Sequence, residues 1–100
     1  MASGWIGILS AELHFPEAHS LKEKRMSVRS AREQLRNRFG AAVAEVDHHD
    51  VWQRTRLTVA VVTREAGEAE RLLADAERYL ASREWELGIL RRELVTLDDE

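Results

Sequence analysis

The sequence has no cysteine, and this absence limits the chemistry that the chain can perform. Without a thiol there is no disulfide, no thiolate metal site and no cysteine nucleophile. The chain also lacks any apolar run near the roughly 20 residues that a membrane-spanning helix needs. Its first residues, from Met1 to Gly4, lack the basic start of a secretory signal. We therefore expect a cytoplasmic protein without a membrane partner.

The length and composition of the chain suit one small domain. One hundred residues, 44% of them hydrophobic, can bury one core but not two. We expect a single domain over residues 1–100, with an ordered core over about residues 5–97 and a frayed acidic end. The net charge of −3 argues by itself mildly against a nucleic-acid binder.

The basic residues are unevenly distributed along the chain. Between Ser20 and Phe39, seven lysines or arginines stand against two glutamates, a local charge of +5. The rest of the chain, with eight basic and 16 acidic residues, carries −8. Such asymmetry predicts a polar molecule with one basic face.

The same segment has the pattern of a long amphipathic helix. Ser20 and Glu23 form the capping box of a helix start, and Gly40 is placed to end the helix. An apolar stripe recurs at helical spacing and comprises Leu21, Val28, Ala31, Leu35 and Phe39. Beside it, steps of three and four predict a continuous row of cations, which we call the basic ridge: Lys22, Arg25, Arg29, Arg32 and Arg36.

The remaining segments predict four strands and a second helix. The strands are expected over residues 5–15, 41–47, 52–63 and 85–97, the last with a bulge near Gly88 or Arg91, and the helix over residues 68–82. Strand, helix, strand, strand, helix, strand is the split βαβ order of the α+β ferredoxin-like fold. We therefore expect a four-stranded antiparallel sheet with both helices on one face.

The uncovered face of that sheet is expected to be apolar at one end and charged at the other. Strand alternation places Glu12, His14, Arg54 and Arg56 at the charged end. The apolar end, which we call the apolar patch, comprises Ile6, Ile8, Ala60 and Val62. Because exposed apolar patches usually mark contacts, we expect this one to join two copies in a homodimer.

Three sequence blocks resemble those of a known family. They are L-H-F-P-E-A-H-S-L-K-E-K-R from Leu13, R-N-R-F from Arg36 and A-E-V-D-H-H-D-V-W-Q-R from Ala44. The chain from Trp5 onward is similar here to the YlxP-like family of small bacterial proteins of unknown function. The resemblance implies a ferredoxin-like fold and genes that often lie among those for translation initiation and ribosome maturation. It implies no established activity and no catalytic residue.

The candidate catalytic residues do not form a recognisable site. Asp47, His48 and His49 spell a tripeptide of two-metal phosphoesterases, but the further Asp and His clusters of those enzymes are absent, and a metal held by the turn from Asp47 to Asp50 would be adventitious. The glycine-containing phosphate loop of acylphosphatases is replaced by Pro16 and its neighbours. We expect no catalytic residue, metal, cofactor or small-molecule substrate.

Binding is the function class that remains. RNA-recognition domains of this strand order stack bases on aromatic residues, where this chain has Arg54, Arg56 and Thr58. The basic ridge could instead follow an RNA backbone without reading its sequence. We therefore expect a non-enzymatic module associated with ribosomal RNA or an assembling ribosomal particle. The alternative is a dimeric structural or adaptor protein whose basic helix meets an acidic protein.

Overall fold

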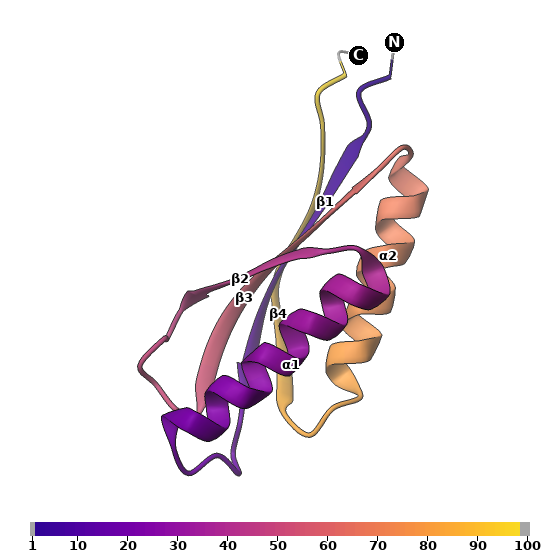
Figure 1. The fold of residues 1–100 in the computed structure, drawn as a ribbon. Coiled ribbons are helices and arrows are strands. Elements are labelled where there is room, and N and C mark those ends of the chain that lie inside the picture. Colours follow the sequence, from indigo (N-terminus) through magenta and orange to yellow (C-terminus); the bar gives the residue numbers. More distant parts are fainter. Residues whose placement is uncertain (1, 99–100) are drawn as a thin grey trace.

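A computed structural model describes residues 2–98 and has the predicted order of elements (Figure 1). The elements are β1 (Trp5–His14), α1 (Leu21–Phe39), β2 (Ala42–Asp47), β3 (Arg54–Thr63), α2 (Ala66–Ala81) and β4 (Glu86–Thr96). The four strands form one sheet in the order β2-β3-β1-β4, with every neighbouring pair antiparallel. The prediction of a ferredoxin-like α+β fold is confirmed.

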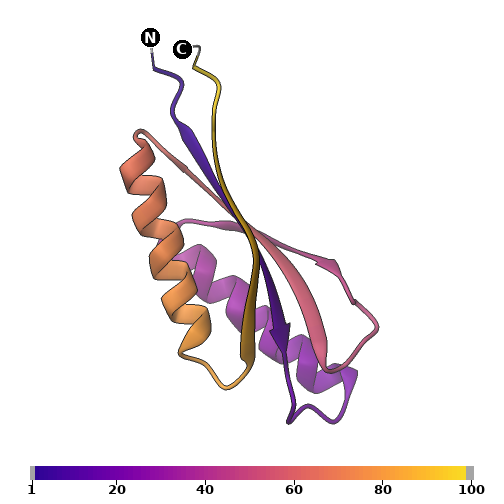
Figure 2. The same cartoon turned by 180° about the vertical axis from the view of Figure 1, so that it is seen from behind.

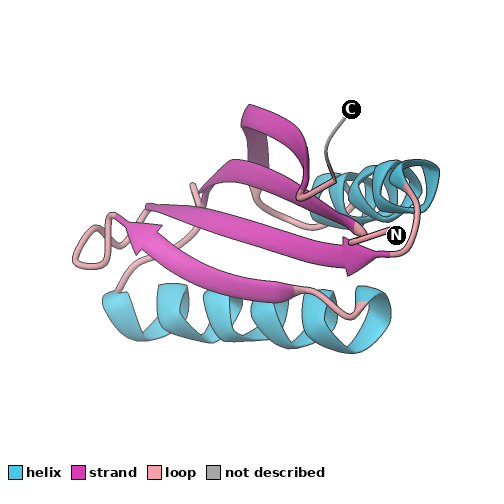
Figure 3. Ribbon diagram, turned by 90° about the horizontal axis from the view of Figure 1, so that it is seen from above, coloured by secondary structure: helices cyan, strands magenta, loops and turns pink. Residues whose placement is uncertain are grey.

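The sheet is strongly twisted, and the helices follow the twist. Figure 3 shows α1 lying along the sheet, whereas α2 is seen nearly end-on. The start of β1 and the end of β4 run side by side at one end of the molecule (Figure 2). Neither of the two helices in the described residues is long and apolar enough to cross a membrane.

The core lies between the helices and the face of the sheet that they cover. Alternate residues of the two central strands point into it, as the sequence pattern predicts. Apolar residues with no exposed surface there are Leu9, Ala11, Leu13, Leu57 and Val59 from the sheet, Ala31 and Leu35 from α1, and Ala69, Leu73, Ala76 and Leu80 from α2. These residues form one continuous cluster, so both helices are fixed against the same apolar layer.

Local side-chain and backbone contacts set the two ends of α1. The Ser20 hydroxyl accepts a hydrogen bond from the Glu23 backbone N–H at 3.2 Å, and the Glu23 carboxylate accepts one from the His19 N–H at 2.7 Å. At the other end Gly40 adopts the left-handed conformation, with φ of 65°, and its N–H donates to the Arg36 carbonyl at 3.0 Å. The predicted start and end of the helix are thus confirmed, and the cap chemistry explains both.

Some element boundaries differ from the prediction. β3 begins at Arg54, because Trp52 lies in the preceding turn, where its side chain is 45% exposed. α2 begins two residues early, at Ala66, after Glu65, which caps the helix without a side-chain hydrogen bond. In β4 the predicted bulge is present: Ser10 faces Arg91 and Ala11 faces Ile89, so one residue of β4 has no partner on β1.

Candidate functional site

The basic ridge occupies the flank of α1 that faces away from α2. Val28, Ala31 and Leu35 point into the core, and at about 100° per residue the ridge lies roughly a quarter-turn round the helix from them. Ser27 and Ser30, on the opposite flank, line a cleft beside the connection between α2 and β4. The five cations therefore lie on one side of α1.

The charges of the ridge have no acidic partners among the described residues. Within residues 2–98, none of its five side chains has a carboxylate within 4.0 Å of its cationic nitrogens. By contrast, five arginines elsewhere each form an ion pair, namely Arg54, Arg56, Arg78, Arg91 and Arg92. Of the remaining arginines, Arg38 and Arg83 lie over aromatic rings. The ridge is thus a row of cations available to an external anion.

Arg32 differs from the rest of the ridge. Lys22, Arg25, Arg29 and Arg36 are exposed, whereas Arg32 is half-buried. Its Nε is buried without a hydrogen-bond partner in the described residues. Four of the five ridge cations are therefore exposed, and Arg32 lies closer to the core.

Lys24 has a role that sequence reasoning missed. Only 1% of this residue is exposed, and its Nζ lies 2.8 Å from a Glu45 carboxylate oxygen. The same ammonium donates hydrogen bonds to the carbonyls of His48 and His49, at 2.7 and 3.2 Å. Three partners use its three donors, so Lys24 ties α1 to β2 and to the turn before β3. The sequence does contain a signal for this burial: Lys24 precedes Val28 by four residues and Ala31 by seven, which places it on the buried face of the helix.

Glu45 completes this buried ion pair. The carboxylate also accepts a hydrogen bond from the hydroxyl of Thr55, which has no exposed surface. Burial opposes ionisation of Glu45, but the hydrogen bonds from Lys24 and Thr55 outweigh it, so the pKa of Glu45 lies below its ordinary value. The charged groups of this cluster contact one another, so the cluster links α1 to β2 and β3.

The charged end of the open face is a second closed network. Glu12 lies 3.1 Å from an Arg54 nitrogen and 3.0 Å from an Arg56 nitrogen, and the Arg56 hydrogen bond is the largest cause that lowers the pKa of Glu12. His14, two residues along β1 on the same face as Glu12, lies 3.0 Å from Glu86 on β4. The arginines predicted on this face are therefore present but paired, since both contact Glu12 and Arg56 also lies 3.9 Å from Asp47.

The turn between β2 and β3 brings no metal-binding cluster together. The Asp47 carboxylate accepts a hydrogen bond from the His48 N–H at 2.7 Å, and His48 adopts a positive φ of 65°. Over residues 2–98, no three His, Asp or Glu side chains gather as a metal ion would require. Asp47 and His48 thus shape the turn.

The apolar patch is assembled as predicted. Ile6 faces Val62 and Ile8 faces Ala60 across the β1–β3 pair. Val62 is 76% exposed, whereas the other three residues are half-buried. Val95 of β4, which the sequence prediction omitted, lies opposite Ile6 and enlarges the patch. The homodimer that this patch would form stays a prediction.

Comparisons with known proteins agree with the family resemblance. The family described as "Protein of unknown function (DUF503)" matches residues 6–93. The chain is 31% identical over 90 residues to "Uncharacterized protein YlxP" of Bacillus subtilis (strain 168), which covers 80% of this chain and 98% of that protein. Among solved structures, the de novo designed protein Ferredog-Diesel aligns over 91% of this chain and 88% of its own, with 15% identity and a TM-score of 0.45. The chain belongs to the DUF503 family of proteins of unknown function.

Proposed function

We propose that the protein is a cytoplasmic, non-enzymatic binding module that contacts structured RNA, in particular ribosomal RNA, through the basic ridge of α1. The observation that carries this proposal is the contrast in charge pairing. The ridge has no carboxylate partner in residues 2–98, whereas the arginines of the open face and of β4 are paired with acids. A row of unpaired cations is the feature that a phosphate backbone requires.

The geometry of the helix suits such a backbone. From Lys22 to Arg36 the ridge covers about 21 Å of helix axis, since each residue adds about 1.5 Å. Its long side chains can reach several phosphates and release their counterions. Contacts of this kind position a protein on RNA without reading the base sequence. We therefore expect binding that depends on RNA charge and shape rather than on a sequence motif.

The charged residues outside the ridge support a binding function over catalysis. Two guanidinium groups lower the pKa of Glu12, so this carboxylate is a poor proton acceptor near neutral pH. Glu45 is enclosed with Lys24 and Thr55 in the same way. Both acids act as links within the fold, and the proposal includes no cofactor or small-molecule substrate.

A matched pair of double variants tests the proposal. Arg25→Glu with Arg29→Glu reverses two exposed ridge charges, and Arg64→Glu with Arg71→Glu makes the same change in net charge at exposed positions away from the ridge. Affinity for a labelled fragment of ribosomal RNA is measured by fluorescence anisotropy at about 50 mM salt. We expect the ridge variant to lose at least roughly tenfold more affinity than the control. Equal losses, or no binding by the wild type, would contradict the proposal.

The alternative proposal is a dimeric adaptor that presents the same ridge to an acidic protein. Val62, the most exposed residue of the apolar patch, favours a dimer. In this case the ridge variant would lose binding to a polyglutamate probe, while the wild type would show no affinity for RNA. Side-by-side titration with the two polyanions distinguishes the proposals.

A further inference from the structure

A cleft of about 300 Å³ lies on the flank of α1 opposite the basic ridge. It is formed where the β1–α1 connection, the first turns of α1 and the α2–β4 connection meet. Its apolar lining includes Phe15, Ala18 and Trp85, none of which is more than 9% exposed. The Trp85 indole donates a hydrogen bond to the Leu80 carbonyl at 2.8 Å, and its ring meets the Phe15 ring edge-on at 5.7 Å. The apolar floor is therefore fixed in position.

The rim of this cleft is acidic. Its exposed carboxylates are Glu17, Glu23 and Glu84, and within residues 2–98 none has a lysine or arginine nitrogen within 4.0 Å. Arg83 is the one basic residue among the described lining, and its guanidinium lies over the Trp85 ring at 5.7 Å. The cleft thus combines a rigid apolar floor with three carboxylates that have no lysine or arginine partner in the described part of the chain.

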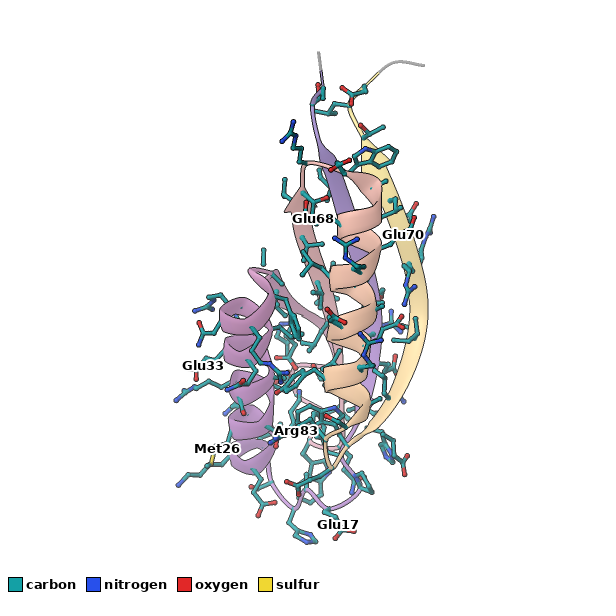
Figure 4. The ribbon with its side chains drawn as sticks, turned by 90° about the vertical axis from the view of Figure 1, so that its right-hand side faces the viewer. Glu17, Met26, Glu33, Glu68, Glu70 and Arg83 are labelled. Carbon is teal, nitrogen blue, oxygen red and sulfur yellow. The ribbon has the colours of Figure 1, made fainter. Side chains whose placement is uncertain are left out.

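The wall on α1 is small and adaptable. Ser27 and Ser30 offer hydroxyl groups that can bond to a peptide backbone. Met26, which is 63% exposed, brings a flexible thioether that can adjust to an apolar group. Figure 4 shows Glu17, Met26 and Arg83 at this end of the molecule, whereas Glu68 and Glu70 lie towards the other end of α2.

We infer that this cleft docks a basic segment of a partner protein, with one large apolar side chain against Phe15 and Trp85 and flanking lysines or arginines against the carboxylates. The volume lies at the lower limit of small-molecule sites, about 300–1,000 Å³, and suits one inserted side chain. The acidic rim repels phosphate groups, so an RNA or a nucleotide does not fit here, whereas cations on the partner complement it. The inference goes beyond the proposed function, since it places RNA and a basic protein on opposite flanks of α1.

A designed peptide tests the inference. The probe is a fluorescein-labelled peptide with a central leucine flanked by lysine and arginine. One comparison peptide has serine in place of leucine, and another has glutamine in place of every basic residue. We expect anisotropy titrations with the wild-type protein to show binding of the first peptide and at least roughly tenfold weaker binding of both comparison peptides. No binding of the first peptide, or equal binding of the serine peptide, would overturn the inference.

Charge-reversed variants locate the binding. Glu17→Lys with Glu84→Lys changes the rim, and Glu68→Lys with Glu70→Lys makes the same charge change at the far end of α2. All four residues are exposed, so both variants should keep the wild-type circular dichroism spectrum. We expect roughly tenfold weaker peptide binding for the rim variant and unchanged peptide binding for the Glu68, Glu70 variant. The wild type should bind RNA with the same affinity whether or not the peptide is bound. Equal losses in both variants would overturn the inference.

A second copy of this chain is the competing occupant. Leu90 is 50% exposed and is followed by Arg91 and Arg92, which would have to leave Glu93 and Glu77 to meet the rim of the cleft. Light scattering of the wild type and the rim variant separates the two cases. Self-association that is lost in the rim variant would replace the partner protein by a second copy, whereas unchanged mass in both supports the inference.

Discussion

At the scale of the single residue, Lys24 decides how α1 is held against the sheet. A buried ammonium is stable only when its donors are used, and here a carboxylate and two carbonyls use them. Replacing Lys24 with methionine keeps the apolar part of the side chain and leaves Glu45 without its cation. We expect a loss of about 3 kcal/mol in the free energy of unfolding, measured by urea titration, because breaking a buried pair leaves an uncompensated charge.

A matched change separates the ion pair from simple loss of packing. The variant with both Lys24→Met and Glu45→Leu removes the charge on each side, and it should recover part of the stability that the single variant loses. If the single variant were as stable as the wild type, Lys24 would not hold the turn before β3.

The stability of the protein in acid depends in part on Glu45, the partner of Lys24. Because the pKa of Glu45 in the folded state lies below the ordinary value of 4.5, the folded state is favoured above that pH and the contribution is lost as the pH falls through the lowered pKa. The lowered pKa of Glu12 acts in the same direction. We expect unfolding temperatures to fall with acidification below about pH 4.5, and to fall less steeply for Glu45→Gln. Parallel curves for the two proteins would contradict this role.

At the scale of the element, α1 owes its first turn to Ser20. The Ser20 hydroxyl accepts from the Glu23 N–H at 3.2 Å, and no other side chain at the helix start takes that place. Ser20→Ala should lower the free energy of unfolding by about 1 kcal/mol. Ser20→Asp restores an acceptor and a favourable charge at the helix start, so it should keep most of the stability in the same urea titration. If Ser20→Ala had the same free energy of unfolding as the wild type, the cap would contribute little to stability.

The elements also show what sequence reasoning could reach. The start and end of α1 were predictable because Ser20, Glu23 and Gly40 act on backbone groups only a few residues away. Lys24 was missed because its partners, Glu45 and two turn carbonyls, are more than 20 residues distant, and only the folded chain brings them together. The cleft beside Trp85 was missed for the same reason, since two connections and the first turns of α1 form it together.

At the scale of the whole molecule, the sheet has one face without a helix. The apolar patch at one end of that face combines residues of β1, β3 and β4, because the register sets Ile6 between Val62 and Val95. We expect the wild type to be a dimer in light scattering and Val62→Lys to be a folded monomer, since a charge at this exposed position would be buried in the interface. A wild type that remains monomeric at high concentration would rule out this dimer.

The two flanks of α1 give the molecule opposite charges across one helix. Within the part of the chain that the structure describes, the ridge cations have no carboxylate partner and the cleft carboxylates have no lysine or arginine partner, although the net charge is only −3. Net charge is therefore a poor guide to what this protein binds, because each surface attracts a different polyelectrolyte. Because RNA binding is proposed for the ridge, its direct test must count the phosphates that the ridge neutralises.

That measurement is the salt dependence of RNA binding. The logarithm of the affinity for structured ribosomal RNA is plotted against the logarithm of the salt concentration for the wild type, the Arg25→Glu, Arg29→Glu variant and the Arg64→Glu, Arg71→Glu control. Each neutralised phosphate contributes a slope of about −0.7 to −0.9. We predict a steep line for the wild type and the control. The line for the ridge variant should show lower affinity at each salt concentration, and its slope should be smaller by at least about the contribution of one phosphate. Identical slopes for the wild type and the ridge variant would contradict the account.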